Sequence, residues 1–196
     1  MRRLAALALM LTCLLPAAAP AADDIQSLKQ AVFNDPGAPV LGNPHGRVTL
    51  VEFSDYNCGF CRKAMPEVAA FLAEHPDVRL VIHETPIFGE GSRYAAMAAL
   101  AADRQGKYPA FHRALMQMRG RAERASVLRA ARAVGLDTHR LERDIQAPEI
   151  TARIEATLDL ADRIGLVGTP SFVAGDQAIF GYLSREDLAA LVAGGS

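Results

Sequence analysis

Two cysteines three positions apart, Cys58 and Cys61, are the residues of this sequence whose type and spacing best suit them to chemistry. A bridge between them would close a very short loop, so it would restrain little of the unfolded chain and contribute little stability. A C-x-x-C pair instead supports disulfide exchange, in which one thiolate attacks and the other sulfur resolves the product. The spacing therefore predicts a redox centre that works without a bound cofactor.

A metal site is the main alternative for the same pair. Zinc normally takes four protein ligands, and the sequence contains no second C-x-x-C. Its histidines show no tight ligand spacing: His45, His75, His83, His112 and His139. Two soft thiolates could also hold Cu(I), with methionines such as Met65 as further ligands, but methionines on helices more often fill a core. We therefore favour redox chemistry over a metal site.

The elements on either side of the pair indicate which cysteine attacks. Residues 48–53 form a nearly continuous β-rich apolar run, typical of a strand that is buried on both faces. After the cysteines, apolar residues recur at helical spacing as far as Leu72, so we expect Cys58 at a helix start. Unpaired N–H groups and the helix dipole stabilise a thiolate there. We predict that Cys58 attacks and that Cys61, one turn further in and shielded, resolves.

Glu52 is the charged residue of that predicted strand, and it shares a strand face with Leu50. Because it stands six residues before Cys58, we expect it beneath the cysteine pair. Desolvation there would raise the pKa of its carboxyl group, which could relay the proton of Cys61 during exchange. The alternative is a solvent-exposed acid at the edge of a sheet, which the apolar neighbours of Glu52 make less favourable.

The remaining pattern predicts one more strand before a long helical block, then a hairpin and a last helix. The strand covers residues 78–84. Helices are expected near 92–105, 108–118, 124–134, 137–145 and 149–165. Gly168-Thr169-Pro170 precedes the hairpin at 171–180, and the last helix, 184–193, has Ser184 as N-cap. A short helix at 24–33 and a Pro- and Gly-rich linker at 35–46 precede the first strand.

This arrangement resembles the thioredoxin fold, an α/β fold, and its helical block resembles the DsbA class of bacterial periplasmic oxidoreductases. The likeness covers roughly residues 40–196 and is carried by Glu52, the stretch 53–61, Pro66 and residues 168–170. It implies that Pro170 is cis and faces the cysteines, although only about 5–6% of X–Pro bonds are cis. It also implies that backbone groups of Thr169 bind an extended substrate peptide. It divides the chain into a thioredoxin-like domain, 47–91 with 166–196, and a helical insertion, 92–165, after an N-terminal helix and linker, 22–46.

Two departures from the best-known DsbA pattern bear on the direction of electron flow. Gly59-Phe60 stands where strong oxidases carry Pro-His, and it resembles the Gly-Tyr of disulfide isomerases, as does Thr169 before the proline. We therefore expect a less oxidising couple than that of DsbA. Isomerases of this kind are dimers built on a long N-terminal domain, and residues 22–46 are too few for one. We expect a monomer.

The first residues predict export. Two arginines precede an uncharged, mostly apolar run at residues 4–15, and small residues follow, which is the layout of a signal peptide. The A-x-A pattern at 19–21 predicts cleavage before Ala22, giving a signal peptide of residues 1–21, or as a second choice before Asp23. A membrane anchor would need roughly 20 apolar residues. Lipid attachment at Cys13 is disfavoured because large residues precede it.

Charge excludes several classes of partner. The formal net charge of −1 falls to −3 once the two N-terminal arginines are removed, whereas nucleic acids and anionic membrane surfaces require a basic footprint. The sequence thus predicts a periplasmic oxidoreductase that donates a disulfide to reduced or unfolded secreted proteins and is reoxidised by a membrane redox partner. The alternatives are a disulfide isomerase or reductase, and a periplasmic copper-binding protein.

Overall fold

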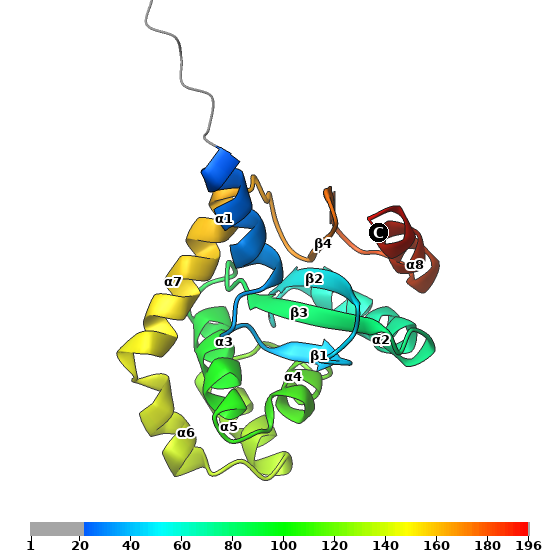
Figure 1. Cartoon of the computed structure of the whole chain (residues 1–196). Coiled ribbons are helices and arrows are strands. Elements are labelled where there is room, and N and C mark those ends of the chain that lie inside the picture. The colour runs from blue at the N-terminus through cyan, green and yellow to red at the C-terminus, as the bar shows by residue number, and fades with distance from the viewer. Residues whose placement is uncertain (1–21, 196) are drawn as a thin grey trace, which may run out of the picture.

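A computed structural model describes residues 22–195 of the protein, so the predicted signal peptide lies outside the described residues. Five strands form one mixed sheet in the order β1-β3-β2-β4-β5 (Figure 1). Their bounds are β1 Val40–Gly42, β2 Val48–Ser54, β3 Val78–Glu84, β4 Ser171–Ala174 and β5 Gln177–Phe180. Strands β2 and β3 are parallel, and the other neighbouring pairs are antiparallel.

Eight helices accompany the sheet within the described residues: α1 Ala22–Phe33, α2 Gly59–Glu74, α3 Glu90–Asp103, α4 Tyr108–Met116, α5 Arg124–Ala133, α6 Thr138–Ile145, α7 Pro148–Arg163 and α8 Arg185–Gly194. Helix α2 connects the two parallel strands, as a parallel pair requires. The five helices α3 to α7 lie between β3 and β4 in the sequence. Together these elements give the thioredoxin-like α/β fold with inserted helices that the sequence predicted.

Alternate residues of β2 face two different cores, as the two-residue period of a strand requires. Leu50 belongs to the core formed with α2, α8 and the inserted helices. Val51 and Phe53 belong to a second core on the other face, formed with α1 and α7. Figure 1 shows α1 and α7 side by side against that face. The central strand is therefore buried on both faces, which explains its apolar run.

Each predicted helix and strand is observed with ends within two residues of the prediction, and one strand was not predicted. Residues 40–42, placed in the linker, form the edge strand β1, which pairs antiparallel with β3. Three residues without a clear alternating pattern give little sequence signal for a strand. Helix α7 packs its Leu160 and Ala161 into the core on the sheet. The domain boundaries themselves remain a prediction.

Candidate active site

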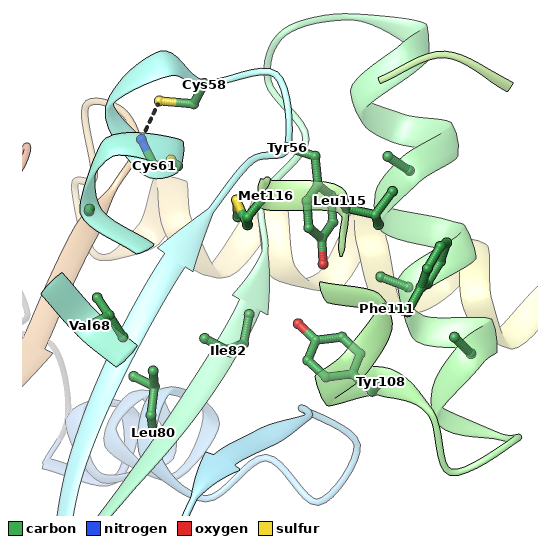
Figure 2. Close-up of a cluster of buried hydrophobic side chains, with 14 of the residues drawn as sticks. Tyr56, Cys58, Cys61, Val68, Leu80, Ile82, Tyr108, Phe111, Leu115 and Met116 are labelled. Atoms are coloured by element: carbon green, nitrogen blue, oxygen red, sulfur yellow. Dashed lines mark hydrogen bonds between the residues drawn. The ribbon is translucent and has the colours of Figure 1, made fainter. Parts of the chain in front are cut away.

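The cysteine pair lies where β2 gives way to α2. Cys58 is the N-cap of α2, with an extended backbone (φ −78°, ψ 118°), so the helix begins one residue later than expected. The backbone N–H of Cys61 donates to the Sγ of Cys58 over 3.4 Å (Figure 2). Both residues are free thiols in this structure. The predicted placement of Cys58 at a helix start is confirmed, and its sulfur receives a helix N–H directly.

Hydrogen bonds to the sulfur lower the pKa of Cys58 to about 6. The largest cause is a hydrogen bond from the thiol of Cys61, which outweighs the opposing effect of burial. The side chain of Thr169 and the N–H groups at the helix start lower the pKa further. Near neutral pH, Cys58 is therefore mostly thiolate, the form that attacks disulfides and also leaves from them.

The pKa of Cys61 is raised far above its usual value. Burial is the largest cause, followed by the hydrogen bond that its thiol donates to Cys58 and by the nearby carboxyl of Glu52. The two cysteines differ in solvent exposure less than we expected, because Cys58 is only 2% exposed and Cys61 is fully buried. The two cysteines therefore differ mainly in charge: near neutral pH Cys58 is mostly a thiolate and Cys61 is a protonated thiol.

The segment before β4 covers the cysteines, and its Thr169–Pro170 peptide bond is cis, as the family resemblance implied. The Sγ of Cys58 lies 3.1 Å from the carbonyl oxygen of Thr169, which accepts from the thiol only while Cys58 is protonated. The hydroxyl of Thr169 is buried and has no hydrogen-bond partner within residues 22–195. It is therefore free to donate to the thiolate, consistent with its lowering of the pKa.

Glu52 lies on the predicted face and is only 4% exposed, which rules out the exposed edge position. Its Oε1 accepts a 2.8 Å hydrogen bond from the hydroxyl of Ser54. Burial raises its pKa to about 7, and the charge of Cys58 adds to the increase. The carboxyl group also lines a cavity of about 330 Å³ between β1, α2 and α4. A buried acid of this pKa can both hold and release a proton at neutral pH.

The residues between β2 and α2, 55–58, form the cysteine-bearing turn. A second buried polar cluster, which the sequence analysis did not identify, contacts this turn through Tyr56. Tyr56 and Tyr108 donate to the same oxygen of Glu84 over 2.6 and 2.7 Å. Figure 2 shows the two hydroxyl groups pointing toward each other from the β2–α2 turn and from α4. Nδ1 of His112 lies within hydrogen-bond distance of both tyrosine oxygens, 3.0 Å from that of Tyr56 and 3.3 Å from that of Tyr108.

Burial dominates the titration of this cluster. It raises the pKa of Glu84 to about 8 and lowers that of His112 to about 4, so both are mostly uncharged at neutral pH. A neutral carboxyl group still accepts both tyrosine protons. The cluster thus links the residue two before Cys58 to α4 without burying a net charge. Glu84 ends a predicted strand, but its partners, 24 and 28 residues away, leave no local sequence signal.

Exposed apolar side chains surround the cysteines. Phe60, between the two cysteines, is 62% exposed, and Val167, just before the cis peptide, is 83% exposed. Ile87 and Phe88 are also exposed, and their N–H groups bond to Asp55 in the cysteine-bearing turn. Exposed apolar side chains that gather in one area of a surface are typical of a site that binds another molecule.

The described residues offer neither an evident metal centre nor a membrane span. Between residues 22 and 195, His, Cys, Asp and Glu side chains form no group of three or more that could hold a metal ion. In the same range no helix has the length and apolar character needed to cross a bilayer.

Comparisons with known proteins agree with this geometry. A family model described as a DSBA-like thioredoxin domain matches residues 49–193. The crystal structure of a thioredoxin-like oxidoreductase from Silicibacter pomeroyi DSS-3 is 55% identical, with a TM-score of 0.82 over 84% of this chain and 95% of that one. A periplasmic thioredoxin-like protein from Salmonella enterica serovar Typhimurium is 32% identical, with a TM-score of 0.76 over 86% of this chain and 95% of that one.

Curated sequences give a different kind of match. A protein named Na(+)/H(+) antiporter NhaA 3, from Salinispora tropica, is 31% identical over 78% of this chain but only 24% of its own length. The chain thus spans about a quarter of the length of that relative. The transport activity in its name refers to the whole relative. The shared segment corresponds in size to the fold described above. The chain belongs to the DSBA-like thioredoxin domain family.

Proposed function

We propose that the protein is a periplasmic dithiol oxidase that passes the Cys58–Cys61 disulfide to thiols of reduced or unfolded secreted proteins. In this proposal residues 1–21 direct export and are removed, and the mature protein acts as a monomer. A membrane redox partner then accepts the two electrons. The apolar surface around the cysteines supports a protein substrate, because an unfolded chain exposes apolar side chains that such a surface binds.

The proposed reaction has two exchange steps. A substrate thiolate attacks the Sγ of Cys58, a mixed disulfide forms, and the Cys58–Cys61 bond breaks. Cys61 leaves as a thiolate and, because its pKa is raised, takes up a proton, for which the carboxyl group of Glu52 is the donor. A second substrate thiolate attacks the substrate sulfur of the mixed disulfide, and Cys58 leaves as a thiolate. The substrate loses two electrons and the cysteine pair gains them.

The lowered pKa of Cys58 is the observation that carries the proposal. At pH 7, a pKa of about 6 in place of the ordinary 9.0 stabilises the reduced form by about 1.4 kcal/mol. For a two-electron couple this makes the disulfide about 30 mV more oxidising. The corresponding cysteine has a pKa of about 7 in thioredoxin and about 3.5 in DsbA. The expected potential therefore lies between their values of about −270 and −120 mV.

An isomerase or reductase is the second candidate, favoured by Gly59-Phe60 between the cysteines and by Thr169 before the proline. Equilibration of the purified protein with glutathione distinguishes the two functions. A potential clearly above about −200 mV supports the oxidase, and a potential near that of thioredoxin supports the reductase.

A trapping experiment tests the exchange mechanism itself. Replacing Cys61 removes the internal attack on a mixed disulfide. In Cys61→Ser the Cys58 thiolate should therefore attack a disulfide of an oxidised substrate or of the redox partner, release one of its sulfurs as a thiolate, and stay joined to the other. These complexes should survive non-reducing denaturant and be released by a thiol reductant. The matched variant Cys58→Ser should trap almost nothing, because the raised pKa of Cys61 keeps it a protonated thiol, which does not attack disulfides. Equal trapping by both variants, or trapping by neither, would contradict a mechanism in which Cys58 alone forms the mixed disulfide.

A further inference from the structure

We propose that Asn57 is a positioning residue, which holds the reactive Cys58 in place by clamping the cysteine-bearing turn to the α4–α5 loop of the inserted helices. The inference rests on the proposed role of Cys58 as the attacking sulfur. Asn57 directly precedes Cys58, and the hydrogen bonds of its side chain go to the backbone of Ala122. It acts through the backbone that leads into the helix.

The clamp uses both ends of the Asn57 amide. Its Nδ2 donates to the carbonyl oxygen of Ala122 over 3.1 Å, and its Oδ1 accepts from the N–H of the same residue over 2.7 Å. Ala122 is fully buried. Gly91 of α3 closes the other side, because a Cβ atom there would stand 2.2 Å from the Ala122 oxygen. The partner of Asn57 is thus itself fixed by close packing.

Asp55 fixes the other side of the same turn. One carboxylate oxygen accepts from the N–H of Asn57 and the hydroxyl of Ser92, over 2.6 and 2.7 Å. The other oxygen accepts from the N–H groups of Ile87 and Phe88. The carbonyl of Asp55 also accepts from the N–H of Cys58 over 3.1 Å. Asn57 therefore holds the turn, which is already held to the β3–α3 loop, to the α4–α5 loop of the insertion.

Arg62 shows that the α4–α5 loop holds both sides of Cys58. The Nη1 of this α2 residue donates to the carbonyl oxygens of Met118 and Gly120, over 3.0 and 2.6 Å. Its Nε donates to the carbonyl of Tyr56 over 2.7 Å. The loop at 117–123 thus contacts the turn before Cys58 through Asn57 and the helix after it through Arg62.

The position of the Cys58 sulfur depends on this backbone. Sγ must stay 3.4 Å from the N–H of Cys61 and within reach of the hydroxyl of Thr169 for its thiolate to be stabilised. Cys58 has the extended conformation of an N-cap, so a rotation of the preceding peptide would swing its side chain away from these groups. Without the clamp, the thiolate should lose part of its hydrogen bonding.

Alkylation of the reduced full chain with iodoacetamide tests the proposal. In Asn57→Ala we expect the Cys58 rate at pH 6 to fall about threefold to tenfold while the rate at pH 10 stays unchanged, since a tenfold change in ionisation equals one pKa unit. The disulfide should also become less oxidising. The matched control is Asn43→Ala, since Asn43 also makes two hydrogen bonds to backbone groups, those of Pro76 and His45, outside the cysteine-bearing turn.

Asn43→Ala should lower stability without changing the pH profile. If Asn57→Ala lowers stability equally and keeps the wild-type profile, Asn57 is only structural and the proposal is wrong. Should Asn57→Ala not fold, Asn57→Ser keeps a polar side chain that is too short to make both bonds to Ala122 and should show a change in the same direction. An unchanged profile there also overturns the proposal. Alkylation needs no protein substrate, so this result is independent of the trapping experiment.

Discussion

Replacing the buried acid under the cysteines should make the protein more stable, and only at neutral and alkaline pH. In Glu52→Gln the amide oxygen still accepts from Ser54, but the group no longer ionises. Glu52 has an ordinary pKa of 4.5 and a folded pKa of about 7, because burial disfavours its charged form. Since the folded pKa is the higher one, the folded protein binds the proton more tightly, and stability falls as the pH rises from 4.5 through 7.

The size of the effect follows from these two pKa values. One pKa unit corresponds to about 1.4 kcal/mol, so at pH 8 ionisation of Glu52 opposes folding by about 3 kcal/mol. At pH 4 the carboxyl is protonated in both states and the penalty is close to zero. Glu52→Gln should therefore raise the free energy of unfolding by about 3 kcal/mol at pH 8 and leave it nearly unchanged at pH 4.

Urea unfolding of the reduced protein at the two pH values measures this difference. Glu84 also titrates with a raised pKa, so wild type and variant must be compared at each pH rather than across pH. Glu149→Gln is the surface control: its pKa is lowered by backbone N–H groups and Arg104, so it should give no gain at pH 8. An equal change in the free energy of unfolding at both pH values, or a decrease at pH 8, would contradict the inference that Glu52 is mostly neutral below pH 7.

Two further predictions concern the cysteines. Iodoacetamide should label Cys58 with a midpoint near pH 6, well below the ordinary thiol value, and leave Cys61 unlabelled in the native reduced protein; peptide mass spectrometry measures this, and equal labelling of both would remove the assigned roles. Equimolar zinc or Cu(I) should barely raise the melting temperature of the reduced protein, since stabilisation grows with ligand concentration over Kd; a large increase that Cys58→Ser abolishes would favour the metal-binding alternative.

The sequence predicted those parts of the site that depend on local order along the chain. The apolar run of β2, the helical spacing after the cysteines and the position of Cys58 between them all follow from residues within one βα unit. The face of Glu52 also followed, because side chains of a strand alternate. The cis peptide before Pro170 came from the family resemblance, since base rates for X–Pro bonds favour trans.

The sequence did not predict the polar contacts that bring distant segments together. Asn57 and Ala122 are 65 residues apart, and Tyr56 and His112 are 56 apart. Each residue alone fits an ordinary loop or helix, and no periodic pattern marks the pairing. Such contacts are set by how the inserted helices pack on the sheet, which depends on side-chain shape across the whole core.

These distant contacts explain why the inserted helices matter to the chemistry. The turn between β2 and α2 has few regular backbone hydrogen bonds of its own, yet it must hold a sulfur within hydrogen-bond reach of one helix N–H. Three successive residues, 55 to 57, therefore send their side chains to partners outside the turn: Asp55 to the β3–α3 loop and Ser92, Tyr56 to Glu84 at the end of β3, and Asn57 to the α4–α5 loop. Because α4 also supplies Tyr108 and His112 to the cluster around Tyr56, a change in how the insertion packs would reach the Cys58 thiolate through two separate hydrogen-bonded routes.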